Sequence, residues 1–163
     1  MRVLGIDPGL NITGYAVVEM QKQRLELVEA GIIRGTERGE MGSRLREIHA
    51  GVVEVIAAFQ PAALAIEELY SHYDRPQTAI LMGHARGVIC LAAAQAGLPI
   101  HNYAATQIKR LLTGNGRAPK AQVQQAILRE FGLREMPEPP DVADAMAIAL
   151  CHHYLQHNLA SSL

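Results

Sequence analysis

The stretch Arg2-Val3-Leu4-Gly5-Ile6-Asp7-Pro8-Gly9 places a short aliphatic run directly before a turn signal. Such a run favours a buried strand, and the Pro-Gly pair ends it. Strand character resumes over residues 13–18 and, after the polar break at 21–23, again over residues 25–34. The short connections between these three strands predict an antiparallel meander, with Asp7 at the end of its first strand.

Beyond the meander, helical and strand patterns alternate. After a loop at residues 36–42, apolar residues recur at intervals of three and four up to Phe59, which predicts an amphipathic helix beginning near Ser43. Residues 62–66 form a brief apolar run closed by Glu67-Glu68, as expected for a buried parallel strand. The later expected elements are a helix over 77–96, a strand over 99–103, and helices over 106–112, 121–131 and about 141–157.

The order βββαβαβααα predicts an α/β fold. Its five-stranded mixed sheet would contain three antiparallel strands and then two parallel ones, flanked by helices, which disfavours a Rossmann domain. The 163 residues are 49% hydrophobic, enough for one core. Because no repeat, linker or low-complexity tract divides them, we expect a single domain over residues 1–163.

Charge is unevenly distributed along the chain. The net charge is -1, yet residues 75–129 contain no Asp or Glu, while the rest of the chain has eight basic and sixteen acidic residues. The basic part could attract a polyanion, or it could simply be a solvated surface. A glycine-rich loop at 113–117, expected to be mobile, suits contact with a phosphate backbone. The basic residues of this part are Arg75, Arg86, Lys109, Arg110, Arg117, Lys120 and Arg129.

The expected compartment is the cytoplasm. Cys90 and Cys151 are the only cysteines, both lie in apolar helical patterns, and the N-terminal residues lack the layout of a signal peptide. The uncharged stretch 87–108 is interrupted by Gln, Gly, Pro and Asn, so a membrane span is not expected.

Four acidic residues lie at strand ends or at a helix start, positions that active-site residues often occupy in α/β proteins. Asp141 and Asp144 are three apart at a helix start and project from one face, and Asp7 and Glu67 each end a predicted strand. Gathering four carboxylates without a cation is unfavourable because like charges raise one another's pKa. Hard oxygen ligands favour Mg²⁺ or Mn²⁺, and two such ions could support phosphodiester hydrolysis. Asp144, in an apolar stretch, is expected to be a buried charge with a partner.

Each of these residues also has a structural interpretation. Acidic residues in the first turn of a helix, such as Asp141, are commonplace, and Asp7 could form an Asx turn. Strand parity puts Glu67 and Glu68 on opposite faces without showing which face holds a site.

Other motifs leave structural alternatives as well. Tyr70 and Tyr73 could stack on unpaired bases or could pack internally. Cys151-His152-His153 resembles a metal tract, but adjacent helical residues point about 100° apart, which favours a structural role. Gly83 and Gly87 allow close approach of another helix, within the fold or across a dimer.

Five blocks of the sequence, from Val3 to about His153, resemble the RuvC family of bacterial Holliday junction resolvases in the RNase H and retroviral-integrase superfamily. The blocks are Gly5-Ile6-Asp7-Pro8-Gly9 with Thr13-Gly14; Ala65-Ile66-Glu67; Gly83-His84-Ala85-Arg86-Gly87; Lys109 with Gly114-Asn115-Gly116 and Lys120; and Asp141-Val142-Ala143-Asp144-Ala145.

The resemblance implies that Asp7, Glu67, Asp141 and Asp144 are catalytic metal-binding carboxylates, which selects Glu67 over Glu68. It further implies two metal ions and a role for Lys109 at the scissile phosphate. Lys109 and Lys120 are the residues that the resemblance implies contact DNA or assist at the scissile phosphate. With the basic segment and the possible base stacking of Tyr70, the expected DNA-binding residues are Tyr70, Arg75, Lys109, Arg110, Arg117 and Lys120. Two positions depart from the family pattern: Tyr70 stands where Phe is usual, and some relatives have His at the position of Asp141.

A homodimer that nicks four-way DNA junctions symmetrically, leaves 5′-phosphate ends and works beside RuvA and RuvB is therefore expected. Three alternatives accompany it. The GIDPG turn with Thr13-Gly14 also resembles the phosphate hairpin of actin-like kinases, although those need two lobes. A related nuclease could act on RNA, and a non-catalytic module could bind junctions and recruit other proteins.

Overall fold

The computed structural model describes residues 1–22, 24–35, 39–69 and 76–160, and its five strands form one mixed sheet. The strand order is β3-β2-β1-β4-β5. β1 pairs antiparallel with β2 and parallel with β4, and β4 pairs parallel with β5. The predicted α/β fold, meander and two parallel strands are confirmed. The strands are β1 (Arg2–Asp7), β2 (Ile12–Gln21), β3 (Arg24–Arg34), β4 (Ala63–Glu67) and β5 (Ile100–Tyr103).

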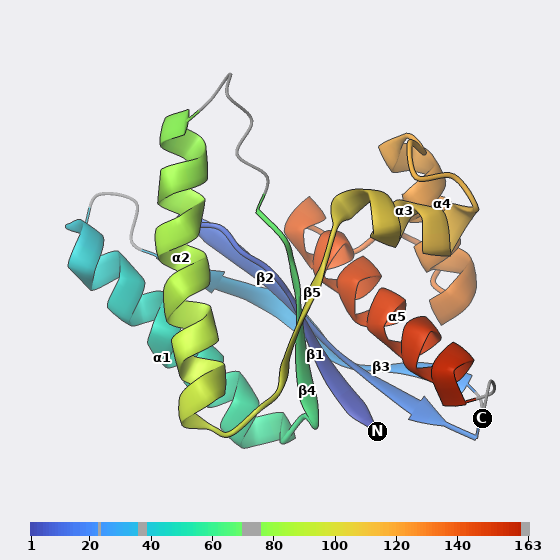
Figure 1. Cartoon of the computed structure of the whole chain (residues 1–163), viewed down its shortest axis with the longest axis horizontal. Helices are drawn as coiled ribbons and strands as arrows, with labels where there is room; N and C mark the ends of the chain where they lie inside the picture. The colour runs from blue at the N-terminus through green and yellow to red at the C-terminus, as the bar shows by residue number, and fades with distance from the viewer. Residues whose placement is uncertain (23, 36–38, 70–75, 161–163) are drawn as a thin grey trace.

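Five helices follow in the expected order and cover both faces of the sheet. α1 and α2 lie on one face, and α5, with α3 and α4 beside it, lies on the other (Figure 1). They are α1 (Met41–Phe59), α2 (Pro76–Gln95), α3 (Ala105–Thr113), α4 (Lys120–Phe131) and α5 (Pro140–Ala160). Among the described residues, none of these helices is both long enough and apolar enough to cross a bilayer.

The start of α1 differs from the prediction near Ser43. Glu40 is the N-cap residue, with extended backbone angles and no side-chain cap hydrogen bond, and the Arg44 amide already donates to its carbonyl at 3.1 Å. Ser43 therefore lies inside the first turn. The prediction relied on the preference for serine at N-caps, but here the chain turns into the helix without a side-chain cap.

Alternation along the central strands divides the apolar residues between two cores. Val3 and Ala65 face α5, whereas Leu4 and Leu64 face α1 and α2. All four side chains are buried. Because both faces are covered, β1 and β4 are apolar along nearly their whole length, as is typical of strands inside an α/β layer structure.

Two glycines allow α5 to approach the sheet closely. A Cβ atom added at Gly5 would lie 2.3 Å from the Ala145 carbonyl oxygen, and one added at Gly14 would lie 2.1 Å from the Asp141 carbonyl oxygen. Both distances are far below van der Waals contact. The absence of side chains on β1 and β2 at these points therefore determines where the first turns of α5 lie.

A buried polar contact ties the other end of α5 to β5. The Tyr103 hydroxyl and His152 Nδ1 lie 2.7 Å apart, and His153 Nε2 lies 3.1 Å from the Val18 carbonyl oxygen. Burial, with His101 and His153 nearby, lowers the pKa of His152 to about 4, so that this imidazole is neutral at pH 7. These two histidines thus have structural partners that account for their burial.

Candidate active site

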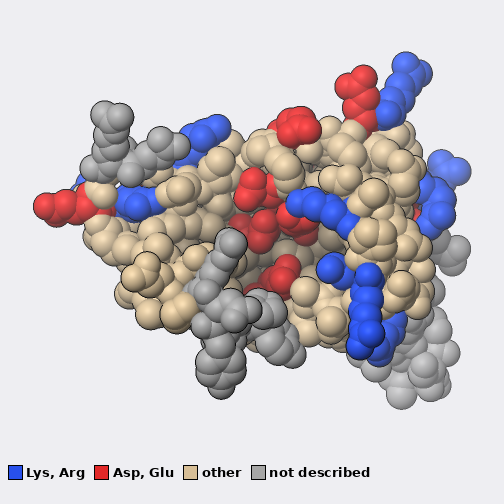
Figure 2. All heavy atoms as spheres, turned by 90° about the horizontal axis from the view of Figure 1, so that it is seen from above, with Lys and Arg blue, Asp and Glu red and all other residues tan. Residues whose placement is uncertain are grey.

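Four carboxylates lie at the end of the sheet where β1 and β4 finish. Asp7 closes β1 and Glu67 closes β4, which is its parallel neighbour. Asp141 and Asp144 lie at the start of α5, which approaches the neighbouring strand β2 closely at Gly14. Figure 2 shows this end of the molecule, with acidic side chains gathered in a central hollow and basic side chains on both sides of it.

Asp7 is the most strongly perturbed acid of the four. The pKa of its carboxyl is raised to about 8, first by burial and then by the negative charges of Asp144, Glu67 and Asp141 in that order, against an opposing effect of Lys120. Three independent segments of the chain therefore bring their charges to bear on one carboxylate. Asp7 thus lies within electrostatic range of the other three predicted metal-binding carboxylates.

Glu67, not Glu68, belongs to this cluster. Ala65 faces α5, so Glu67, two residues further along β4, faces the same side, whereas Glu68 is exposed. Burial and the charge of Asp144 raise the pKa of Glu67, and Lys109 lowers it. The ambiguity that strand parity left open is resolved by which face of the sheet α5 covers.

Asp144 is not the buried charge that its apolar neighbours suggested. Its side chain is 40% exposed and forms an ion pair with Lys120 at 3.3 Å. The flanking residues Val142, Ala143, Ala145 and Met146 are buried. The prediction was wrong because, with about 3.6 residues per turn, one position between apolar residues can still face the open side of a helix.

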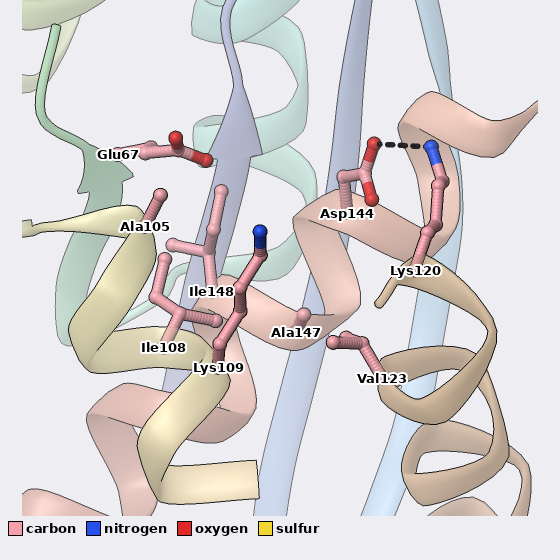
Figure 3. A pocket seen from close by; sticks show the side chains of 9 residues that line it. All are labelled: Glu67, Ala105, Ile108, Lys109, Lys120, Val123, Asp144, Ala147 and Ile148. Atoms are coloured by element: carbon pink, nitrogen blue, oxygen red, sulfur yellow. Dashed lines mark hydrogen bonds and ion pairs between the residues drawn. The ribbon is translucent and has the colours of Figure 1, made fainter. Parts of the chain in front are cut away.

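A pocket of about 160 Å³ links Glu67 and Asp144 to two lysines. Lys109 extends from α3 and Lys120 from the start of α4, and both side chains point toward the pocket in Figure 3. Apolar side chains from α3, α4 and α5 form the remaining wall. The full lining is Glu67, Ala105, Ile108, Lys109, Lys120, Val123, Asp144, Ala147 and Ile148.

The other predicted DNA-binding residues lie away from this pocket or outside the described part of the chain. Arg110 lies on α3 beside the loop at 113–117, since a Cβ atom at Gly116 would lie 3.6 Å from its Nε. Arg117 donates its backbone amide to Asn115 Oδ1 at 2.9 Å within that loop. Tyr70 and Arg75, like Tyr73, fall outside the described residues.

The loop at 113–117, expected to be mobile from its glycines, has internal hydrogen bonds. The Thr113 hydroxyl donates to the Lys109 carbonyl at 2.7 Å and accepts from the Asn115 amide at 3.2 Å. Thr and Asn side chains commonly stabilise turns in this way. The prediction considered the two glycines and overlooked these side chains.

One part of the site was missed by the sequence analysis. Asn11 and Arg44 line a second cavity, which Asp141 also lines, and the Arg44 guanidinium donates to Asn11 Oδ1. These two residues are 33 positions apart. No local pattern joins them, because a turn between strands and the first turn of a distant helix meet only in the folded chain.

The donor set at the strand ends fits a hard divalent cation. Carboxylate oxygens are preferred ligands of Mg²⁺ and Mn²⁺, and the raised pKa values of Asp7 and Glu67 show charge that a cation would compensate. In the part of the chain that the structure describes, no three His, Cys, Asp or Glu side chains form a ready-made metal site. Asp144 is instead paired with Lys120 at 3.3 Å.

Comparisons with known proteins identify the family of the chain. The sequence profile of the family described as "Crossover junction endodeoxyribonuclease RuvC" matches residues 3–152. A curated relative of that description from Rhodopirellula baltica is 58% identical over 156 residues, which is 96% of this chain and 88% of the relative.

Solved structures with the same fold include RuvC of Thermus thermophilus. It is 35% identical, with a TM-score of 0.89 and 96% of each chain covered. The structure described as that protein in complex with Holliday junction substrate superposes with a TM-score of 0.87, covering 96% of this chain and 94% of the other. By sequence and fold, this chain belongs to the RuvC family of crossover junction endodeoxyribonucleases.

Proposed function

We propose that this protein resolves four-way DNA junctions by metal-dependent hydrolysis of phosphodiesters, with Asp7, Glu67, Asp141 and Asp144 as the carboxylates that hold the cations. The observation that carries the proposal is the electrostatic effect of the other three acids on Asp7, which supports a shared role of the four carboxylates. Two cations, Mg²⁺ or Mn²⁺, fit the four carboxylates.

The residues of the chain have separable tasks in this reaction. When bound, the divalent ions supply Lewis-acid activation of water and of the phosphoryl oxygen. Lys109, whose charge already acts on Glu67, is placed to offset negative charge that develops on the phosphate. Water adds across the phosphorus–oxygen bond, leaving a 5′-phosphate and a 3′-hydroxyl.

The decisive assay is cleavage of a labelled synthetic four-way junction. We expect paired, symmetric nicks with Mg²⁺ or Mn²⁺, none with EDTA, and little cleavage of duplex DNA, single strands or RNA–DNA hybrids. Preference for the hybrid would favour a related RNA nuclease. Junction binding without cleavage in either metal would favour a recruitment module and reject the proposal.

Lys120 gives a prediction about DNA contact. Its pairing with Asp144 is exposed, so Lys120→Gln should change the free energy of unfolding by less than about 1 kcal/mol. If Lys120 contacts a phosphate, the variant should bind the junction more weakly, and the slope of log affinity against log salt should fall by about one. Fluorescence anisotropy across a salt series measures both quantities.

Lys22→Gln is the matched control, because Lys22 is exposed just beyond β2, at the end of the sheet away from Asp7. It should leave affinity and slope unchanged. A Lys120→Gln protein with wild-type affinity and salt slope would show that Lys120 pairs with Asp144 but does not contact the DNA.

We further propose a homodimer in which α2 faces its symmetric copy. Ile80 and Leu91 on α2 are 61% and 50% exposed, and nothing lies within 4 Å of a Cβ atom added at Gly87 among the described residues. A second copy would bury these apolar side chains and place two active sites for paired nicks.

The dimer is tested by changing Leu91. Leu91→Glu should shift the sedimentation profile from dimer to monomer, because an interfacial charge would lose its hydration, whereas Leu91→Met should remain dimeric. A wild-type protein that sediments as a monomer at micromolar concentration would refute the dimer.

Family membership also supports three wider proposals. The chain forms one nuclease domain, since all its described strands join one sheet. It works with RuvA and RuvB, which co-sedimentation with those proteins on a junction would test. It acts in the cytoplasm, in keeping with two unpaired cysteines, and fractionation of cells would test this location.

A further inference from the structure

A second cavity, of about 560 Å³, opens on the other side of the catalytic carboxylates from the lysine pocket. The lysine pocket is lined by α3, α4 and α5, whereas this cavity is lined by the turn between β1 and β2 and by α1 and α2. Asp141 lines it and joins it to the active site. The residues around it are Gly9, Leu10, Asn11, Ile12, Arg44, Thr78, Leu81, Met82 and Asp141.

Arg44 provides the positive charge of this cavity and is incompletely satisfied. One terminal nitrogen of its guanidinium donates to Asn11 Oδ1. Its Nε is buried, and within the described residues it donates no hydrogen bond. No carboxylate of those residues forms an ion pair with Arg44. A buried guanidinium donor without an acceptor is costly, so the group calls for an external acceptor.

The surroundings select the chemistry of that acceptor. An arginine fork matches the oxygens of a phosphate, and the Asn11 amide and Thr78 hydroxyl add neutral donors in the same cavity. Asp141 would repel a free anion. A phosphate of the same strand as the scissile phosphate can overcome this repulsion. It enters the cavity with its strand, once cations offset the charge of the carboxylates.

We propose that Arg44, with Asn11 and Thr78, binds a backbone phosphate of the cleaved strand beside the scissile phosphate. This inference rests on the proposed function. The strand is then held from both faces of the sheet, by Lys109 and Lys120 on one side and by Arg44 on the other, which sets the position of the scissile bond over the carboxylates.

Arg44→Met tests the contact, because it keeps the length of the side chain and removes the charge. We expect about tenfold weaker junction binding and a salt slope smaller by about one. Arg46→Met is the matched control, since Arg46 is exposed on the same helix. It should change neither quantity. Arg44→Lys should keep the salt slope while binding more weakly than the wild type, which gives a second measurement should Arg44→Met fold poorly.

The contacted phosphate is found with junctions that carry one neutral methylphosphonate at successive positions near the cut. At one position the substitution should lower the cleavage efficiency of the wild type but leave that of Arg44→Met unchanged, as a double-mutant cycle requires for a direct contact. If Arg44→Met is as sensitive as the wild type at every position, the inference is wrong.

Asn11→Ala distinguishes a phosphate-binding role of Arg44 from a purely structural one, because it removes the side chain to which Arg44 donates. If Arg44 only braces the β1–β2 turn, Asn11→Ala and Arg44→Met should lower the melting temperature alike and show no methylphosphonate selectivity, which would overturn the inference. A wild-type protein that fails to bind the junction would instead reject the proposed function itself.

Discussion

Asp7→Asn is expected to abolish junction cleavage and to leave junction binding intact. Asn has nearly the same shape as Asp but carries no charge, so the proposed cation ligand set loses one of its four carboxylates. Loss of such a group should lower the single-turnover cleavage rate on the order of 10³-fold or more. The rate is measured on a labelled junction with Mg²⁺ at saturating enzyme.

Binding should survive because the phosphate contacts come from other residues. Asp7 lies near Glu67, Asp141 and Asp144, and Asn adds no negative charge there, so repulsion of the polyanion does not increase and affinity should be equal or higher. Glu68→Gln is the control: it removes an exposed carboxylate next to Glu67 and should cut normally. Wild-type cleavage by Asp7→Asn would show that the catalytic carboxylates lie elsewhere.

Gly14→Ala should displace the first turn of α5 and thereby separate the carboxylates. The new Cβ atom would lie 2.1 Å from the Asp141 carbonyl oxygen, and backbone cannot rotate aside as a side chain can. Overpacking of this kind costs about 1–3 kcal/mol of folding free energy. The cleavage rate should fall by more than the loss of folded protein explains, because Asp141 and Asp144 move with the helix.

The measurements are urea unfolding and cleavage at a temperature where the variant is folded. Gly42→Ala is the control, since a Cβ atom there meets nothing within 4 Å and Gly42 lies inside α1, so alanine should stabilise the protein by up to about 1 kcal/mol. If Gly14→Ala keeps wild-type stability and cleavage, the close approach of α5 does not position the site.

Local patterns were sufficient for the strands, the helices and their order. The aliphatic run before Pro8-Gly9 and the three-and-four spacing up to Phe59 depend on residues within a few turns of one another. The errors occurred where a neighbour in space mattered more than a neighbour in sequence. Asp144 faces an open pocket and pairs with Lys120 from another helix, despite its apolar neighbours along the chain.

By itself, the sequence determined the order of elements, the placement of Asp7 and Glu67 at strand ends, and the pairing of Asp141 with Asp144 on one helix. Only the tertiary structure decided that α5 covers the face bearing Glu67, that Gly5 and Gly14 let it approach, and that Arg44 meets Asn11 beside Asp141. The physical reason is the separation along the sequence over which each kind of interaction acts. Hydrophobic periodicity and turn preferences act along neighbouring residues, whereas helix packing and electrostatic interactions act between segments that only folding brings together.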